Sequence, residues 1–492
     1  MVLNSSFSYP PLVTPSQTRI VLLAPGKEDA PIHCFHLVID LDADWDLPSP
    51  SQTPPPSNLQ SHSQSYITAR YKNSTATLSF MTPPLHMRSD EDGGGLHPFQ
   101  KYTALSYVWG DQKNPREIVL NGHSFQVGHS LYTALRRLQK KRGVIQLDPD
   151  PENTLEDRFP RSWRRQVASE GVLLWIDAMC INQANLHERE AQVKLMSRIY
   201  SQAVHVHAEL EYTSNEDVRN LVNLLQKIRA AGSICESSQP SPSEDDSAAL
   251  SKMVSSIEKN WKVINSKSKL RRLAPAPRVP KASVPTLEDY GLPPATDAVW
   301  SLWRNLMKSV YFGRLWIIQE FALADRISIW FGNVGLDPEM IRDCLVYLKQ
   351  YSTNRSSYLT VDNATGAFDS ATESGFFAFI RLMRQRDLRH GENTLTTKQS
   401  RLLELLALSR EAQATDQRDK IYGMLGLASD RDRFMPLVSY SKPTREVFKD
   451  FCQRFVEVGQ GIEMLYQVDS GTSELPTWIP VSYTSKPHYR LM

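Results

Sequence analysis

The chain has 492 residues, of which 41% are hydrophobic, and this is enough for two or three domains with buried cores. Its 56 Lys and Arg against 54 Asp and Glu leave a net charge of +2, which gives no electrostatic argument for binding nucleic acid or acidic lipid. Five scattered cysteines without a Cys-x-x-Cys pair argue against a disulfide framework and a cysteine zinc site. No secretory signal pattern and no run of ~18 apolar residues is present, so we predict a cytoplasmic protein without a membrane span.

Two segments carry too much Pro, Ser and charge to bury apolar surface. Residues 47–64 contain the run Pro-Ser-Pro-Ser-Gln-Thr-Pro-Pro-Pro and are predicted to be disordered. Residues from about 235 to 294 have a similar composition and are predicted to form a disordered insertion. Residues 1–46 precede the first of these segments and form a lead-in to the main domain.

Strand and helix patterns alternate between these segments. The expected strands are residues 104–109, 172–176, 204–206 and 327–331, and the expected helices are residues 130–141, 186–203, 299–310 and 314–324. Alternation of this kind predicts an α/β fold with a doubly wound, mostly parallel sheet flanked by helices over residues 100–334. Helical patterns dominate afterwards, at residues 376–386, 400–411, 418–427 and 444–458, so residues 335–492 are predicted to be a mainly helical C-terminal region.

The most informative segment of the chain is the strand, turn and helix between residues 172 and 203. Val172–Ile176 is a continuous apolar run, which is typical of a strand that is covered on both faces. Asp177 follows at the carboxyl end of this strand, where open α/β sheets bind their ligands.

The helix that follows places a permanent charge among apolar side chains. Arg189 lies in the middle of the apolar stripe, so its guanidinium needs either a carboxylate or a bound anion as its partner. Glu188 stands three residues after Asn185, which is the spacing of a capping box. Glu190 and Lys194 have the favourable order for a solvated ion pair.

Several long motifs occur in the order found in one family. The motifs are Arg19–Gly26 and Ile32–Cys34 in the lead-in, then Tyr102-Thr-Ala-Leu-Ser-Tyr-Val-Trp-Gly110, Leu174–Tyr200, Arg314-Leu-Trp-Ile-Ile-Gln-Glu320, Ala414–Ala428 and Leu475–Pro480. Together they closely resemble the fungal heterokaryon-incompatibility (HET) domain and the segments around it. One departure is the strand end at residues 203–210, which lacks the Trp-Leu-Gly that this family commonly has there.

The resemblance implies a fold and an activity. HET domains are thought to be related to TIR domains, so the expected sheet is TIR-like or flavodoxin-like. Some TIR domains cleave NAD with an essential glutamate in a Trp-x-x-x-Glu setting, and Trp316 and Glu320 have that spacing. This analogy makes Glu320 the candidate catalytic residue, NAD the candidate substrate, and no bound cofactor necessary.

The chemistry fits a single carboxylate. Breaking the bond between ribose and nicotinamide develops positive charge on the sugar, and the ring departs neutral, so no general acid is required. Glu320 would stabilise that charge, and Trp316 on the same helix face would help to desolvate it and raise its pKa. Six further residues are candidates for binding substrate: Asp177, Asn182 and Gln183 for ribose hydroxyls or the carboxamide, and Ser106, Trp109 and Gly110 for close approach and stacking. Arg189, near the start of its helix, is the candidate for the pyrophosphate.

Structural roles are the alternative for the same residues. Glu320 and Arg189 would then form a buried ion pair, while Asp177 and its neighbours would only satisfy backbone groups in a turn. The charged motif Asp416–Lys420 is most simply a helix start, with Arg418 and Lys420 on the solvent side.

Two functions therefore stay open. In the first, the protein is an effector of non-self recognition that triggers programmed cell death by an enzymatic act, with NAD cleavage as the candidate reaction. In the second, it is a non-enzymatic signalling adaptor that acts through homotypic association of its domain. Both give it a protein partner from a genetically different strain, and neither involves nucleic acid.

Overall fold

The structure is a computed structural model in which part of the chain is described. The described residues are 7–24, 26, 30–42, 64–71, 74–81, 102–140, 145–146, 172–211, 214–237, 286–332, 334–352, 358, 369–390 and 401–465. The segment expected to be disordered at residues 47–64, except for Gln64, and most of the expected insertion at 235–294 lie outside them, as does the motif Leu475–Pro480.

A sheet of ten described strands organises the fold, in the order β7-β6-β2-β1-β9-β5-β10-β11-β12-β8. Its strands are β1 (Gln17–Leu23), β2 (His33–Asp40), β5 (Thr103–Tyr107), β6 (Arg116–Leu120), β7 (His123–Val127), β8 (Ile145–Gln146), β9 (Val172–Trp175), β10 (His205–Leu210), β11 (Ile327–Phe331) and β12 (Val334–Leu336). A separate hairpin pairs β3 (Gln64–Tyr71) with β4 (Ser74–Met81).

The α/β class is confirmed, but the sheet is mixed rather than mostly parallel. Its centre follows the expectation, because β9, β5, β10 and β11 are parallel neighbours. The lead-in changes the picture: β1 and β2 form an antiparallel hairpin, and β1 also pairs antiparallel with β9, so that Leu22 faces Leu173. A short connection between two strands allows only this antiparallel pairing, and strand periodicity does not reveal it.

The β6–β7 hairpin is a second addition to the expected strands. Asn121 (φ 53°) and Gly122 (φ 80°) connect the two strands in left-handed backbone conformations. Two consecutive positive φ angles define the tight turn that matches the twist of a hairpin, and Asn-Gly is the dipeptide that adopts it most readily. The dipeptide is therefore the sequence signal for these two strands.

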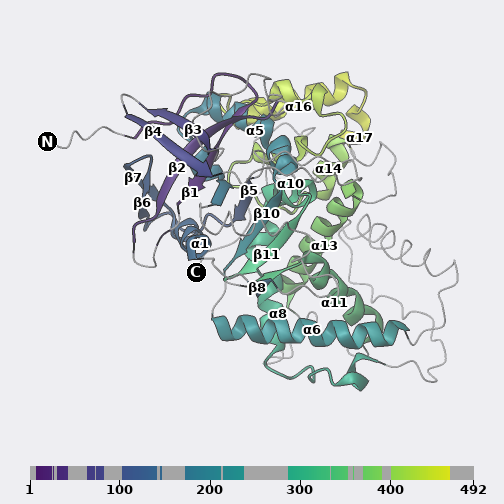
Figure 1. Cartoon of the computed structure of the whole chain (residues 1–492). Helices are drawn as coiled ribbons and strands as arrows, with labels where there is room; N and C mark the ends of the chain where they lie inside the picture. The colour runs from purple at the N-terminus through teal and green to yellow at the C-terminus, as the bar shows by residue number, and fades with distance from the viewer. Residues whose placement is uncertain are drawn as a thin grey trace, which may run out of the picture. The chain divides into compact units, whose positions relative to one another are not determined.

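Helices surround the sheet in the larger of two compact units, Met1–Asn215, Met307–Pro338 and Ser374–Met492. They are α1 (His129–Lys140), α4 (Asp177–Cys180), α5 (Leu186–Gln202), α9 (Val310–Gly313), α10 (Leu315–Leu323), α13 (Ser370–His390), α14 (Leu402–Leu408), α15 (Asp419–Leu425), α16 (Thr444–Glu457) and α17 (Gly461–Leu465), with 3-10 turns at Arg431–Arg433 and Met435–Leu437. Helix α10 lies beside α5 (Figure 1) and packs against both α5 and α15. Nearly all of its residues are buried. A helix that is apolar all round must be buried, and this forces Glu320 into low-dielectric surroundings.

The second compact unit comprises Glu216–Leu306 and Glu339–Glu373. Its described helices are α6 (Asn215–Ser237), α8 (Trp300–Met307) and α11 (Pro338–Tyr351), with a 3-10 turn at Leu287–Tyr290. The Cys344 thiol donates to the carbonyl of Leu225 at 3.3 Å, and the ring of Trp300 lies 4.4 Å from that of Tyr358.

Three features of the described residues bear on function. None of the described helices combines the length and the apolar character that crossing a membrane requires. No group of three or more His, Cys, Asp or Glu in the described part is placed to hold a metal ion. All five cysteines are buried and free.

Candidate functional site

Glu320 lies at the centre of a buried group of polar side chains. Its side chain is 6% exposed, and the Ser106 hydroxyl from the end of β5 donates to its Oε2. The Tyr311 hydroxyl lies 2.6 Å from Ser106 Oγ, and the Tyr200 hydroxyl from α5 lowers the pKa of the carboxyl group. Three segments that are far apart in the sequence therefore converge on one carboxyl group.

This environment makes the carboxyl group titrate near neutrality. Burial raises the pKa of Glu320 to about 7. The positive charge of Arg314 and the hydrogen bond from Ser106 lower the pKa, but their effect is smaller than that of burial. The negative charge of Asp177 raises the pKa further. Perturbation by desolvation together with a specific charge partner is the pattern that marks candidate functional sites.

Asp177 begins α4 at the carboxyl end of β9, as its position in the sequence predicts. Trp109 Nε1 donates to its Oδ2 at 2.8 Å, and the Ala178 amide donates to its Oδ1 at 2.7 Å. Burial raises its pKa, and the main opposing effect is again the charge of Arg314. Arg314 donates to the Tyr107 carbonyl and is thus the cation shared by both carboxylates. Nothing in the sequence marks it except that it opens the Arg314–Glu320 motif.

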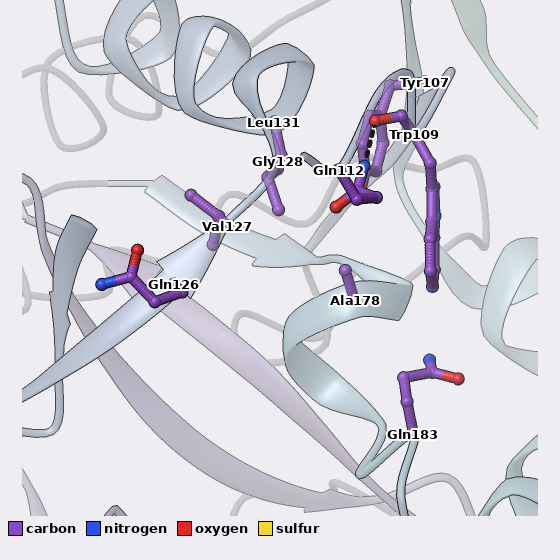
Figure 2. A pocket seen from close by; sticks show the side chains of 9 residues that line it. All are labelled: Tyr107, Trp109, Gln112, Gln126, Val127, Gly128, Leu131, Ala178 and Gln183. Atoms are coloured by element: carbon purple, nitrogen blue, oxygen red, sulfur yellow. Dashed lines mark hydrogen bonds between the residues drawn. The ribbon is translucent and has the colours of Figure 1, made fainter. Parts of the chain in front are cut away.

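A small hollow lies beside this group. It has a volume of about 160 Å³ and is lined by Tyr107, Trp109, Gln112, Gln126, Val127, Gly128, Leu131, Ala178 and Gln183 (Figure 2). Successive residues of a strand point to opposite faces, so Ser106 faces Glu320 while Tyr107 faces the hollow. The lining accordingly includes the candidates Trp109 and Gln183, but neither Ser106 nor Glu320.

The turn after Asp177 is held by backbone contacts. The Gln183 Nε2 donates to the Asp177 carbonyl at 3.0 Å, and the Asn182 side chain accepts from the Ala184 amide at 3.3 Å. The backbone role considered above is therefore the one observed for Asn182. Gly110, the last candidate in this region, has a φ of 64°, and a Cβ there would lie 2.5 Å from the Ser130 hydroxyl, so only glycine fits.

The Glu188 side chain also stabilises the turn after Asp177. Half of the expected capping box forms, since Asn185 accepts from the Glu188 amide at 3.2 Å. The Glu188 carboxylate, however, accepts from the Asn182 amide at 2.7 Å and from both terminal nitrogens of Arg19 at 2.6 and 3.1 Å. Arg19 comes from β1 and is 1% exposed, so the lead-in supplies a buried ion pair under the candidate site.

Arg189 does not meet Glu320, so the expected ion pair between them is wrong. Its guanidinium lies 3.8 Å from the ring centre of Tyr440, and 3.7 and 3.9 Å from carboxylate oxygens of Asp416 and Asp419. Its partners are therefore carboxylates of the protein and not a bound anion. Both carboxylates come from a segment more than 220 residues later in the sequence. We call Arg189, Asp416, Asp419 and Tyr440 the rim cluster.

Trp316 on α10 contacts the rim cluster. Its Nε1 donates to Asp419 Oδ2 at 3.1 Å, and the Tyr440 hydroxyl donates to Asp419 Oδ1 at 2.5 Å. Burial nevertheless raises the pKa of Asp419 to about 6. Trp316 therefore connects the helix of Glu320 to α15.

Comparison with known proteins identifies a family for the part of the chain that carries these side chains. The family model described as "Heterokaryon incompatibility protein (HET)" matches residues 102–147 and 152–320, which contain Ser106, Asp177 and Glu320. These residues of the chain form a heterokaryon-incompatibility (HET) domain. The chain is 24% identical over 410 residues to "Heterokaryon incompatibility protein 6, OR allele" of Neurospora crassa, over 78% of this chain and 54% of that protein. The chain thus spans about half the length of the curated relative it matches, and no solved structure matches it.

The HET domain is completed by residues beyond the end of the family match. Glu190 on α5 accepts from the Ser439 hydroxyl at 3.0 Å and from the amides of Tyr440 and Ser441. The expected solvated pair of Glu190 with Lys194 is therefore wrong. Lys420 is also not on the solvent side: it is 7% exposed, and its Nζ donates to the Arg410 and Ala412 carbonyls. Helical periodicity cannot show that a later segment covers an apparently solvated face.

We expect Arg189→Met to destabilise the HET domain by about 1–2 kcal/mol, because it removes a cation stacked on Tyr440 and leaves two carboxylates adjacent. Urea unfolding would measure the change. Arg198→Met on the same helix is the matched control, because Arg198 pairs with an Asp42 that is 65% exposed, and such pairs contribute below about 1 kcal/mol. Equal effects of the two substitutions would contradict a structural role for the rim cluster.

Proposed function

We propose that this HET-domain protein acts in heterokaryon incompatibility, the process for which its Neurospora relative is named. We also propose that it triggers programmed cell death by cleaving NAD. The single observation that carries the enzymatic part is a buried glutamate with a pKa of about 7 that accepts from Ser106. A TIR-like relationship of the fold, a cytoplasmic location and a protein partner from a different strain complete the proposal.

The reaction follows from one carboxylate. The bond between ribose C1′ and the pyridinium nitrogen breaks, and its electron pair neutralises the departing nicotinamide. The ionised Glu320 stabilises the positive charge that develops on the sugar, and a water oxygen then bonds to C1′ and releases a proton to solvent. Asp177 after β9 and Gln183 in the turn after α4 are proposed to hold the substrate, and Arg314 is proposed to keep Glu320 ionised.

Access to Glu320 sets a condition on this mechanism. Glu320 is 6% exposed and does not line the hollow, whereas Tyr107 and Trp109, which follow Ser106 in the chain, do. The proposal therefore requires the segment Tyr107–Trp109 to move when substrate binds. Movement of a loop that completes a catalytic site is a common step in enzymes.

Incubation of the purified protein with NAD, followed by measurement of free nicotinamide, tests the proposal. We expect kcat/KM to rise about tenfold per pH unit below pH 7 and to level off above it, because the reactive form of Glu320 is ionised and its pKa is about 7. Glu320→Ala should abolish the release. Turnover that persists undiminished in this variant would contradict the assignment of Glu320.

One observation favours a second function. Ser106 donates to Glu320 and is itself hydrogen-bonded to Tyr311, and all three side chains are buried, as in a structural network. A non-enzymatic adaptor acting through homotypic association would need no more than this. Absence of nicotinamide release under conditions that promote oligomers would favour the adaptor.

A further inference from the structure

The hollow beside Asp177 has an unusual lining for a site next to two carboxylates. All nine side chains that line it are uncharged (Figure 2). Two are aromatic, three are glutamines, and the remainder are small or apolar. Phosphate and carboxylate groups are held by cationic side chains such as arginine. The lining therefore provides no cationic side chain for such anions and suits a group without negative charge.

The glutamines present hydrogen-bond acceptors. Gln112 Nε2 donates to the carbonyls of Trp109 and, at 3.3 Å, Gly110, and Gln183 Nε2 donates to the carbonyl of Asp177 at 3.0 Å. Because the amide nitrogens are fixed on backbone carbonyls, the two amide oxygens remain to accept hydrogen bonds from a ligand. A ligand that matches them carries an N–H donor.

Trp109 provides a fixed flat surface. Its Nε1 is tied to Asp177 Oδ2 at 2.8 Å, which fixes the orientation of the indole. Figure 2 shows the ring edge-on, with one face toward the side of the hollow where Ala178 lies. An indole face attracts planar rings and, through its quadrupole, cationic ones.

The volume limits the size of the ligand. At about 160 Å³ the hollow is smaller than the sites of ~300–1,000 Å³ that take a drug-sized molecule. It can hold one ring system and not a whole dinucleotide.

We propose that this hollow binds a planar nitrogen heterocycle that carries an amino or carboxamide donor and no negative charge. The inference rests on the proposed function, in which such a ring is one end of the substrate: the nicotinamide or the adenine of NAD. It adds Gln112 and Gln183 as residues that select the ring by its donor. The carboxylate analogue of the same ring is rejected, because it presents no donor and a negative charge faces two amide oxygens.

Nicotinamide, nicotinate and adenine are the probes for this site, added separately to the full chain and followed by saturation-transfer NMR. We expect nicotinamide or adenine to bind and nicotinate not to bind. Whichever of the two binds identifies the end of the dinucleotide that the hollow holds. Equal binding of nicotinamide and nicotinate, or no binding of either donor-bearing ring, would overturn the proposal.

Substitutions separate the hollow from the catalytic group. Gln112→Met and Gln183→Met keep the side-chain length but remove the acceptor and the Nε2 hydrogen bonds to the backbone carbonyls. Each should therefore weaken binding of the ring at least about tenfold, and a tenfold loss is equivalent to one hydrogen bond of ~1.4 kcal/mol. Gln112 is exposed, so its variant should fold, and Gln453→Met on α16 is the matched control. Unchanged binding in both variants would overturn the roles of the glutamines. Glu320→Ala should retain ring binding, so failure of NAD cleavage with binding intact would refute the proposed reaction alone.

Discussion

Replacing Glu320 with glutamine is expected to stabilise the HET domain above neutral pH while it abolishes nicotinamide release. The pKa of Glu320 rises from 4.5 to about 7 on folding, chiefly because the carboxylate loses its water. The folded state therefore binds the proton more tightly than the unfolded state. The wild type should lose about 3 kcal/mol of stability as the pH rises from 4.5 through 7, and nothing further above that.

Glutamine has nearly the shape of the protonated acid and cannot ionise, so the variant escapes this loss. Its cost for altered interactions with Ser106 and Tyr200 is the same at every pH. The free energy of unfolding of the variant minus that of the wild type should therefore increase by about 3 kcal/mol between pH 4 and pH 8. Urea unfolding across this range measures it.

A matched control is Glu446→Gln, which removes an exposed carboxylate from α16. Because Glu446 is exposed to solvent in the folded protein, this variant removes no buried carboxylate and is the reference for the pH series of Glu320→Gln. If the stability differences of Glu320→Gln and Glu446→Gln show the same dependence on pH, then burial does not destabilise the ionised carboxylate of Glu320. Retention of an ionisable group that destabilises the fold is what a functional site predicts, whereas a purely structural network has no need of it.

The central strands and helices could be predicted from the sequence because their signals are local. Val172–Ile176 is an uninterrupted apolar run, and a strand covered on both faces has no other simple pattern. Strand β11 has the expected limits Ile327–Phe331, and α10 lies within the expected helix at 314–324. In each case the residues that decide the structure are adjacent in sequence.

Pairings between distant segments could not be predicted in this way. The stripe on α5 shows that Arg189 needs a partner, but periodicity cannot choose among carboxylates elsewhere in the chain. Arg189 pairs with Asp419 and not with Glu320 because α15 packs against α10 at Trp316. That packing is a property of the whole fold. The role of Arg314 could not be predicted for the same reason. Its charge acts on both Glu320 and Asp177 only because β5, β9 and α10 converge in the fold.

The lead-in strands hold one side of the candidate site through buried hydrogen bonds. Besides the ion pair of Arg19 with Glu188, His36 on β2 hydrogen-bonds the Met179 carbonyl at 2.8 Å. Burial lowers the pKa of His36 to about 4, so this imidazole is neutral at physiological pH. Two strands outside the family match thus fix the turn that carries Asp177 and Gln183.

Arg19→Met is expected to destabilise the HET domain by about 3–5 kcal/mol. Arg19 is 1% exposed, and its loss leaves the Glu188 carboxylate, which is 14% exposed, without its cation. The Pro10 and Cys180 carbonyls, which accept from Arg19 at 2.7 and 3.0 Å, also lose their donor. Urea unfolding measures the loss. Arg454→Met is the control, because the pair of Arg454 (37% exposed) with Glu457 (49% exposed) should contribute below about 1 kcal/mol.

The double variant Arg19→Met, Glu188→Met distinguishes loss of charge pairing from loss of packing. Removing both charges leaves no uncompensated carboxylate, so much of the lost stability should return. The Asn182 amide still loses its acceptor, so the turn should loosen even in the recovered protein. Binding of the heterocycle in the hollow should then remain weaker than in the wild type although the fold is restored. An Arg19→Met variant no less stable than Arg454→Met would show that the lead-in does not hold the turn, and full ring binding in the double variant would show that the hollow does not depend on it.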